Sequence, residues 1–256
     1  MKPLEHNGDM CLIAFQWQLE RPVPLFVVGN RDEFYDRPTA PLAWWEGGGI
    51  LAGRDLKAGG TWLGVTLEGR FAALTNYRDP GLTKPDRASR GQIPLRFLEG
   101  GQPGRAFLDE FREEALHYNP FNLLLFDGKE LLGYESHHDR VRSFTPGIHV
   151  LSNGDFDAPW PKAEALKAGL ASAQDDDETL LTLLRDTRPF GDDRLPNTGV
   201  PLEWERALSP AFIHTPTYGT RASTILRLGR ESVSVLEQCF TFEGPGERSA
   251  LGFQRG

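Results

Sequence analysis

The sequence predicts an α+β protein in which antiparallel sheets are covered by helices. Apolar, strand-like runs come in groups separated by groups of helical segments, in the order strands, helices, strands, helices, strands. This order lacks the alternation of single strands and helices that is typical of parallel βαβ folds. The chain of 256 residues is long enough to bury a substantial core. We expect one domain over residues 11–256.

The first two strands are expected to form a hairpin. Residues 11–18 (CLIAFQWQ) and 25–30 (LFVVGN) are apolar runs joined by a proline-containing turn. If the turn is centred midway between the two runs, the residue numbers of each antiparallel pair sum to about 43. The register can differ from this estimate by one or two residues. Cys11 then lies opposite Asp32, with Arg31 adjacent. The first and last residues of this hairpin are therefore neighbours.

The remaining elements follow from periodicity and turn signals. The Asp127-Gly128 pair between two apolar runs is typical of a tight hairpin. Apolar residues at helical spacing, among them Phe107 and Phe111, indicate an amphipathic helix. Further strands are expected at 50–52, 62–67, 71–76, 122–126, 130–135, 149–153, 212–215, 222–228 and 232–242. Helices are expected at 92–99, 104–117, 161–173 and 177–186, with irregular chain at 34–49 and a surface loop at 187–210.

Composition and charge exclude several classes of function. The net charge of −8 disfavours nucleic acid and anionic membranes as partners, because both reward dense Lys/Arg surfaces. Two cysteines provide neither a disulfide framework nor a zinc site. We find no apolar run long enough to span a bilayer and no signal-peptide core in residues 1–10, and we expect a cytoplasmic protein. Residues 1–10 are interpreted as an extension that is removed or not native, with Met10 as the natural initiator.

Three apolar strands end in asparagine, at Asn30, Asn76 and Asn153. A single asparagine at a strand end more often caps a turn with its side chain. Two of these asparagines lead into an Arg-Asp pair within three residues, at Arg31-Asp32 and Arg78-Asp79. Together with a nearby cysteine, this clustering favours a pocket lined by amide groups.

Cys11 differs from an ordinary buried cysteine because it follows Met10. Methionine is normally removed before a small residue, which would make Cys11 the mature N-terminus. An N-terminal cysteine carries a thiol with a pKa of about 8.5 and an α-amine with a pKa of about 7.7–8.0, so the amine can accept the thiol proton. A nearby guanidinium favours the thiolate, and asparagine N–H groups can stabilise an oxyanion. Cys239, inside an apolar run, is interpreted as a small core residue.

Several short motifs together resemble one known family. These are Met10-Cys11, Asn30-Arg31-Asp32-Glu33, and the segments 53–65 (GRDLKAGGTWLGV), 73–78 (ALTNYR), 149–154 (HVLSNG) and 218–221 (YGTR). Their order and span resemble the NRDE family, also called the transport and Golgi organization protein 2 family. That family is similar to the N-terminal nucleophile (Ntn) hydrolases, which implies a four-layer αββα sandwich of two antiparallel sheets flanked by helices.

The resemblance also implies roles for individual residues. In the cysteine branch of the Ntn hydrolases, an N-terminal Cys is followed by an Arg and Asp, a later oxyanion Asn and a late Arg. These roles fall on Cys11, Arg31, Asp32, Asn153 and Arg221. Asn76 is expected as a second oxyanion donor. We expect Asn30, Trp44, Trp62 and Tyr218 to contact the substrate, although the tryptophans are equally consistent with core positions.

Two functions remain open. The first is hydrolysis of an amide or thioester acyl bond in a small amphipathic or lipid-like substrate, with Cys11 as nucleophile. The second, suggested by animal members of the family, is non-catalytic binding and transfer of haem or of a lipid or acyl-CoA. No metal or resident cofactor is expected, with haem as a possible ligand. The sequence does not indicate an oligomeric state.

Other conspicuous residues have weaker interpretations. The pair Gly59-Gly60 is expected to form a turn in preference to a catalytic role. The pair His137-His138 is a possible haem ligand but more typical of an exposed loop, and His214 is more often a core histidine. Asp55 and Glu33 receive no definite role.

Overall fold

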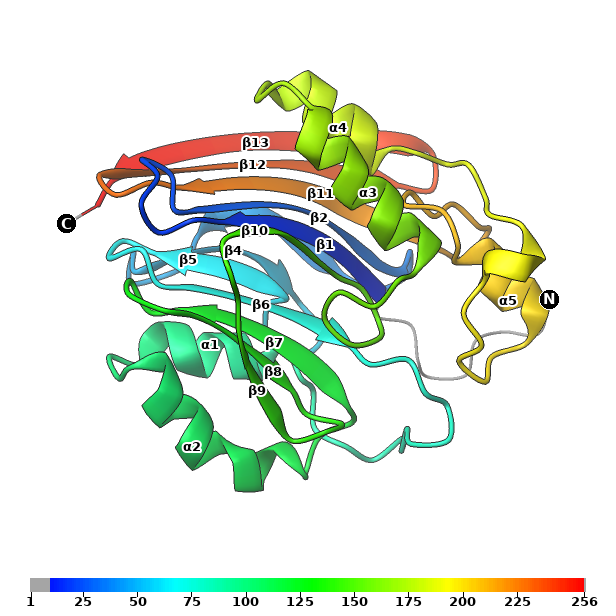
Figure 1. Cartoon of the computed structure of the whole chain (residues 1–256), viewed down its shortest axis with the longest axis horizontal. Coiled ribbons are helices and arrows are strands. Elements are labelled where there is room, and N and C mark those ends of the chain that lie inside the picture. The colour runs from blue at the N-terminus through cyan, green and yellow to red at the C-terminus, as the bar shows by residue number, and fades with distance from the viewer. Residues whose placement is uncertain (1–9, 256) are drawn as a thin grey trace.

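The computed structural model describes residues 10–255 as two antiparallel sheets stacked face to face (Figure 1). Helices α3 (Pro161–Ser172) and α4 (Asp177–Leu184) cover the outer face of one sheet, and α1 (Gln92–Glu99) and α2 (Gly104–Ala115) cover the outer face of the other. The predicted α+β sandwich with αββα layers is confirmed. The predicted extension at residues 1–9 lies outside the described residues, whereas Met10 is buried and begins the first strand.

The six-stranded sheet has the order β10-β1-β2-β11-β12-β13. Its strands are β1 (Met10–Trp17), β2 (Leu25–Phe34), β10 (Gly147–Leu151), β11 (Tyr218–Leu228), β12 (Ser232–Thr241) and β13 (Gly244–Gln254). The hairpin β1–β2 lies near its centre, so both of these strands are covered on both faces. This explains why their apolar residues are nearly continuous and do not alternate.

The seven-stranded sheet is a meander in chain order, from β3 to β9. Its strands are β3 (Thr39–Trp44), β4 (Ile50–Asp55), β5 (Leu63–Thr66), β6 (Phe71–Asn76), β7 (Phe121–Phe126), β8 (Leu131–Glu135) and β9 (Arg140–Ser143). Every pairing in this sheet is antiparallel. Short connections join the neighbouring strands except β6 and β7, between which the chain forms α1 and α2.

Helices α1 to α4 pack through apolar stripes onto the outer sheet faces, whereas α5 (Leu202–Ala207) contributes Trp204 to a separate cluster that includes Met10. A short 3-10 turn lies at Asp192–Arg194. Phe97 and Phe107 lie in the core between the α1–α2 layer and its sheet, and Leu166 and Leu181 lie under the α3–α4 layer. A third core, which includes Phe15 and Phe71, fills the space between the two sheets.

Several boundaries differ from those that the sequence predicts. The predicted strand at 25–30 continues through the polar motif to Phe34, because the motif's backbone pairs with both β1 and β11. The predicted strand at 212–215 is wrong, and His214 makes only an isolated bridge to Gly219. The segments 34–49 and 187–210, expected to be irregular, contain β3 and α5. Strands β9 and β13, which are polar and lie at sheet edges, were not anticipated.

The register of the β1–β2 hairpin differs by one residue from the register predicted for a turn centred midway between the two strands. Cys11 pairs with Arg31, and Met10 pairs with Asp32. Paired residues lie on the same face of a sheet, and successive residues lie on opposite faces. Arg31 therefore shares the face of Cys11, between the two sheets, whereas Asp32 projects toward the helical layer.

No helix within residues 10–255 combines the length and apolar character needed to cross a membrane.

Candidate active site

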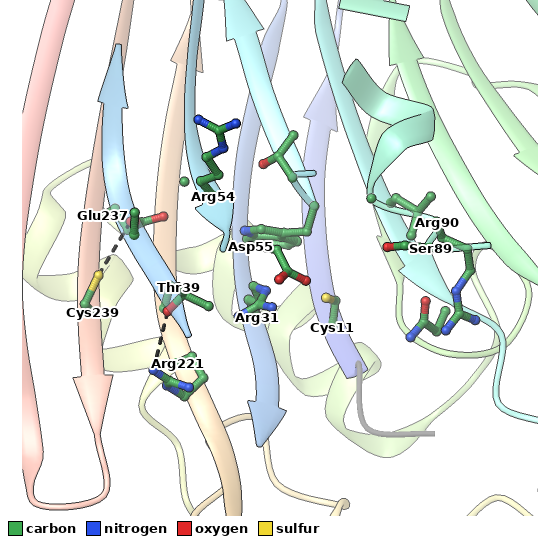
Figure 2. Close-up of a pocket in the computed structure, with 18 residues that line it drawn as sticks. Cys11, Arg31, Thr39, Arg54, Asp55, Ser89, Arg90, Arg221, Glu237 and Cys239 are labelled. Atoms are coloured by element: carbon green, nitrogen blue, oxygen red, sulfur yellow. Dashed lines mark hydrogen bonds between the residues drawn. The ribbon is translucent and has the colours of Figure 1, made fainter. Parts of the chain in front are cut away.

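A pocket lies between the two sheets, with Cys11 in its wall (Figure 2). The six-stranded sheet contributes Cys11 and Arg31, and the seven-stranded sheet contributes Asn76 from the end of β6. Trp62, which precedes β5, also lines the pocket. Cys11 itself is only 4% exposed. Concave sites between packed elements, lined by a few polar groups, are the kind of site that binds small molecules.

The floor of the pocket contains a row of four residues on neighbouring strands. Cys11 pairs with Arg31, Arg31 pairs with Ala222, and Ala222 pairs with Cys239. Neighbouring strands are about 4.8 Å apart, so the two cysteines at the ends of this row are too far apart to form a disulfide. Burial raises the pKa of Cys239 to about 12, which leaves it a protonated thiol that donates to Glu237.

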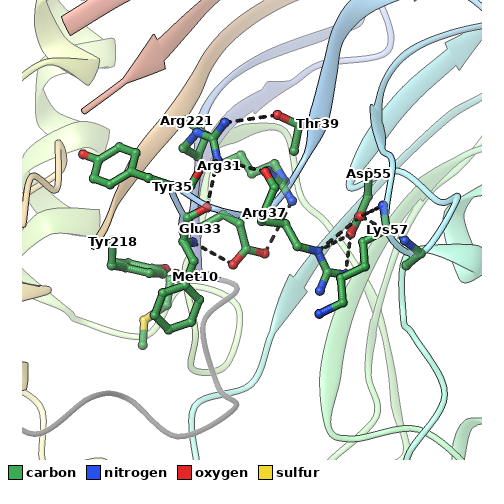
Figure 3. A network of polar contacts seen from close by, with 12 residues as sticks. Met10, Arg31, Glu33, Tyr35, Arg37, Thr39, Asp55, Lys57, Tyr218 and Arg221 are labelled. Atoms are coloured by element: carbon green, nitrogen blue, oxygen red, sulfur yellow. Dashed lines mark hydrogen bonds and ion pairs between the residues drawn. The ribbon is translucent and has the colours of Figure 1, made fainter. Parts of the chain in front are cut away.

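Arg221 is directed toward the start of β3 by a β-bulge. The pairing of β11 with β2 shifts between Thr220 and Ala222, so Arg221 is the extra residue. Its guanidinium donates to four backbone carbonyls, those of Phe34, Tyr35, Arg37 and Phe240, at 2.8–3.2 Å. Figure 3 shows Arg221 beside Tyr35 and Arg37. Burial, followed by the charge of Arg31, lowers the pKa of Arg221. The residue holds the chain between β2 and β3 against the pocket.

Two acidic residues without a predicted role stabilise the same region (Figure 3). Glu33 accepts the backbone N–H of Phe34 at 2.7 Å. Asp55 forms an ion pair with Arg37 at 2.7 Å and accepts two backbone N–H groups of the following loop. Burial would raise the pKa of Asp55, but these hydrogen bonds from Arg37 and the loop outweigh it and hold that pKa below its usual value.

Asp32 lies on the opposite face of β2 and is completely buried. Its Oδ1 accepts the hydroxyl of Thr220 at 2.6 Å, whereas its Oδ2 has no hydrogen-bond donor among the described residues. Burial raises the pKa of Asp32 to about 6, and the ammonium of Lys162 opposes that shift. A buried carboxylate oxygen without a donor is costly and marks a position where a ligand or a new group fits.

Asp32 belongs to a buried charge cluster with Arg78, Lys162 and Glu205. Arg78 and Glu205 form an ion pair at 3.0 Å, and each side chain is 4% exposed. Lys162, in the first turn of α3, donates to the carbonyl of Leu208 at 3.0 Å, and burial lowers the pKa of Lys162 to about 8. The cluster has two positive and two negative side chains.

The buried charge cluster surrounds Met10, the residue before Cys11. The backbone N–H of Met10 donates to the hydroxyl of Tyr218 at 3.0 Å, and Arg78 Nη1 lies 3.5 Å from the Met10 sulfur. Trp204 and Leu208 pack around the methionine side chain. The cluster therefore lies beside the peptide bond that joins residues 10 and 11.

Sequence reasoning did not assign site roles to Lys162, Arg78 or Glu205. Lys162 precedes Leu166 and Leu170 by four and eight residues, which places it on the buried stripe of α3, and this spacing was an available signal. Arg78 was noticed only as half of an Arg-Asp pair. Nothing in the segment around Glu205 marked it as buried.

The two oxyanion candidates lie side by side. Asn153 Nδ2 donates to the backbone carbonyl of Asn76 at 2.9 Å, and Ser152 donates to Asn153 Oδ1 at 3.3 Å. Asn76 lines the pocket that contains Cys11, whereas Asn153 lines a neighbouring surface cavity. The amide nitrogen of Asn153 carries two hydrogens, so one of them is left to donate to another acceptor after the contact with Asn76.

Three of the four residues predicted to contact substrate lie outside the pocket. The amide of Asn30 faces the helical layer, where it binds the carbonyls of Leu184 and Ala211 and the hydroxyl of Ser223. Trp44 packs on Phe253 in the core, and Tyr218 is completely buried. Only Trp62 of this set lines the pocket.

The glycines of the segment 53–65 have distinct structural roles. Gly59 has a positive φ of 73°, as expected of a turn glycine. Gly60 lies against Gly91, and a Cβ on Gly60 would lie 2.4 Å from the carbonyl carbon of Gly91. Thr61 donates its backbone N–H to the Gly91 carbonyl at 3.0 Å. This close approach fixes the chain at 89–91 as one wall of the pocket.

The histidines within residues 10–255 do not line the pocket. His138 contacts Asp155 at 3.2 Å, His137 packs on Tyr77, and His214 contacts the Tyr35 hydroxyl at 3.1 Å. Within residues 10–255, no group of three or more His, Cys, Asp or Glu side chains is arranged to hold a metal ion.

Comparison with known proteins gives the family. The model of the family described as Transport and Golgi organisation 2 matches residues 10–241. This chain belongs to the Transport and Golgi organisation 2 family. The predicted NRDE family membership is thereby confirmed.

Curated relatives of the Transport and Golgi organisation 2 family align over most of their length. The Transport and Golgi organization 2 homolog of Mus musculus is 32% identical over 247 residues, which cover 85% of this chain and 88% of the relative. The Homo sapiens homolog has the same identity and coverage. Transport and Golgi organization protein 2 of Drosophila melanogaster is 27% identical over 260 residues, covering 87% and 89% of the two chains.

Proposed function

We propose that this protein is an N-terminal-cysteine hydrolase that cleaves acyl amides or thioesters. The observation that carries the proposal is the buried Oδ2 of Asp32, which has no hydrogen-bond donor among the described residues and belongs to the residue opposite Met10. Loss of the residues up to Met10 would create an α-amine on Cys11 beside this oxygen. The new N–H groups would supply the donor that Asp32 lacks.

The reaction proceeds in two halves. The α-amine of Cys11 accepts the thiol proton, and the thiolate attacks the acyl carbonyl. The amides of Asn76 and Asn153 donate to the oxyanion, and the protonated amine returns the proton to the departing amine or thiol. Water then attacks the thioester carbonyl with the same amine as base, which releases the carboxylic acid and restores the thiol. Arg31, next to Cys11 in the ladder, favours the thiolate.

The test combines mass spectrometry with substitution of the nucleophile. Intact mass of protein purified without a tag is expected to correspond to a chain that begins at Cys11. Cys11→Ala is expected to abolish turnover of a panel of acyl anilides and acyl thioesters, with an unchanged far-UV circular dichroism spectrum. A chain that keeps residues 1–10 and hydrolyses these substrates at full rate would disprove the mechanism.

A second candidate is binding and transfer of haem or an acyl lipid without turnover. The relatives are named for transport and Golgi organization, which favours a carrier role. The exposed His137 and His138 offer nitrogen ligands outside the pocket. Stoichiometric retention of haem or of an acyl-CoA, with no hydrolysis across the acyl panel, would favour this candidate. Loss of a haem Soret band in a His137→Ala/His138→Ala variant would specify it.

A further inference from the structure

Arg31 presents a guanidinium to the pocket with few of its hydrogen bonds used. Its side chain is 13% exposed, and its nearest polar contact among the described residues is Glu33 Oε2 at 3.5 Å. That distance is at the outer limit of a hydrogen bond. A guanidinium carries five N–H donors in a planar fork, which matches a carboxylate. Arg31 lines the pocket, and most of these donors have no other hydrogen-bond partner among the described residues.

Two other carboxylates that line the pocket, those of Asp55 and Glu237, interact with partners other than Arg31. Asp55 forms an ion pair with Arg37. Glu237 accepts the backbone N–H of Leu42 at 2.7 Å, and burial raises its pKa. The guanidinium of Arg221 adds a second positive charge close to Arg31, because the two are near enough for the charge of Arg31 to lower the pKa of Arg221. The local field therefore favours an anionic ligand.

The lining of the pocket is unlike that of a site for a long acyl chain. Trp62 and Leu74 are its only large apolar side chains among the described residues. Most of the others are charged or carry hydroxyl or amide groups. An alkyl chain gains free energy by leaving water for apolar surroundings, and this lining provides few of them.

The two walls beside Cys11 differ in depth. On the side of Arg31 the wall includes Ala222 and Glu237, which are buried, and the partly exposed Thr39, Arg221 and Cys239. On the other side the pocket is closed by the segment 89–91, whose residues are exposed or partly exposed. The acyl half stays bonded to Cys11 during the reaction, whereas the leaving group departs. The acyl half therefore fits the more buried side, next to Arg31, and the leaving group fits the open side.

We propose that the substrate is a compact acyl compound whose acyl half ends in a carboxylate, and that Arg31 binds this carboxylate beside Cys11. This inference rests on the proposed hydrolase function and names its substrate class. Cys11 and Arg31 are direct cross-strand partners whose side chains share one face, so we choose substrates in which only two or three methylene groups separate the carbonyl from the carboxylate. Succinyl and glutaryl amides have this spacing.

The experiment compares two substrates of equal length that differ only in the terminal charge. Hydrolysis of N-succinyl-p-nitroanilide and N-glutaryl-p-nitroanilide is measured against their methyl esters, with the complete chain as purified. We expect kcat/KM to be roughly 10- to 100-fold higher for the acids, which corresponds to one charged hydrogen-bonded pair. This comparison needs no protein variant, so it does not depend on whether a substituted chain folds.

Substitutions then assign the preference to Arg31. Arg31→Met is expected to remove most of the acid-over-ester preference, and Arg31→Lys to retain part of it, since lysine keeps the charge but loses the planar fork. Arg54→Met is the matched control, because Arg54 also borders the pocket but its guanidinium lies over Trp45 at 4.5 Å. It is expected to keep the preference.

Two outcomes separate this inference from the proposed function. Equal rates for acids and esters in the original chain, or an unchanged preference in Arg31→Met, would overturn the carboxylate site and leave the hydrolase intact. If no acyl compound is turned over, calorimetry with glutarate and with its uncharged dimethyl ester decides. Tighter binding of glutarate that is lost in Arg31→Met would support the anion site without catalysis, and equal or absent binding would overturn it.

Discussion

Met10 lies directly opposite Asp32 in the β1–β2 ladder, and the carboxylate of Asp32 is buried with one oxygen lacking a donor among the described residues. The residue before the candidate nucleophile thus occupies the centre of the buried charge cluster. In that cluster Arg78 and Lys162 balance Asp32 and Glu205. A neutral α-amine on Cys11 would leave the cluster neutral, whereas an α-ammonium would add a buried positive charge. The cluster therefore favours the neutral amine, the form that can accept a proton.

Lys162→Met is expected to raise the pKa of the Cys11 α-amine by roughly one unit or more, because an unbalanced Asp32 favours the ammonium. The measurement is the rate of Cys11 alkylation by iodoacetamide as a function of pH, followed by peptide mass spectrometry so that Cys239 is counted separately. Lys162→Arg, which keeps the charge, should largely preserve the profile. Lys167→Met is the matched control, since Lys167 lies on the same helix but is partly exposed and contacts Asp157. Superimposable profiles for Lys162→Met and the original chain would contradict this electrostatic role.

Stability is expected to depend on pH through Asp32. Its pKa is raised from 3.8 to about 6 in the folded protein, so the folded state binds the proton more tightly than the unfolded chain. The stabilisation is fully present below pH 4 and is lost as the pH rises through 6. Relative to Asp32→Asn, the original chain should thus gain on the order of 2–3 kcal/mol in free energy of unfolding between pH 7 and pH 4. Urea denaturation of both proteins across this range measures the difference, and parallel curves would refute it.

The buried ion pair between Arg78 and Glu205 should be sensitive to loss of one partner. Glu205→Ala leaves the guanidinium buried without its counter-charge, which typically costs about 3–5 kcal/mol. Arg206→Ala, on the same helix, removes an exposed pair with Asp192 and should cost about 1 kcal/mol or less. Chemical denaturation of the two variants at neutral pH checks the contrast. Similar losses in both would show that burial does not distinguish the pairs.

Gly60→Ala is expected to disrupt the wall formed by residues 89–91. The added Cβ would collide with the backbone of Gly91, which has no flexible side chain to move aside. We expect a loss of about 1–3 kcal/mol in stability, together with a higher KM for any substrate of the pocket. Gly49→Ala is the control, because a Cβ on Gly49 would have no described atom within 4 Å and the φ of Gly49 is not positive. Thermal unfolding and steady-state kinetics of both variants provide the readout, with equal melting temperatures as the contrary result.

The amino-acid sequence alone determined the α+β class, most of the helices and the β1–β2 hairpin. These features can be predicted from the spacing of apolar residues, because each depends on residues that are close together in the chain. Strands β3, β9 and β13 were missed because their exposed or edge positions remove the apolar alternation by which strands are recognised. The sequence also identified Cys11, Arg31 and Asn76, which the fold brings together around one pocket.

Tertiary structure decided the features that depend on register and on long-range packing. The observed pairing differs by one residue from the predicted pairing, and side chains alternate along a strand. Asp32 therefore lies on the opposite face of the sheet from Cys11 and not on the same face. Lys162 and Glu205 lie far from Met10 in the sequence, and their charges meet around it only when α3 and α5 pack against the strand ends. The sequence supplies the reactive groups, and the register and helix packing determine which of them face the pocket and which surround the residue before Cys11.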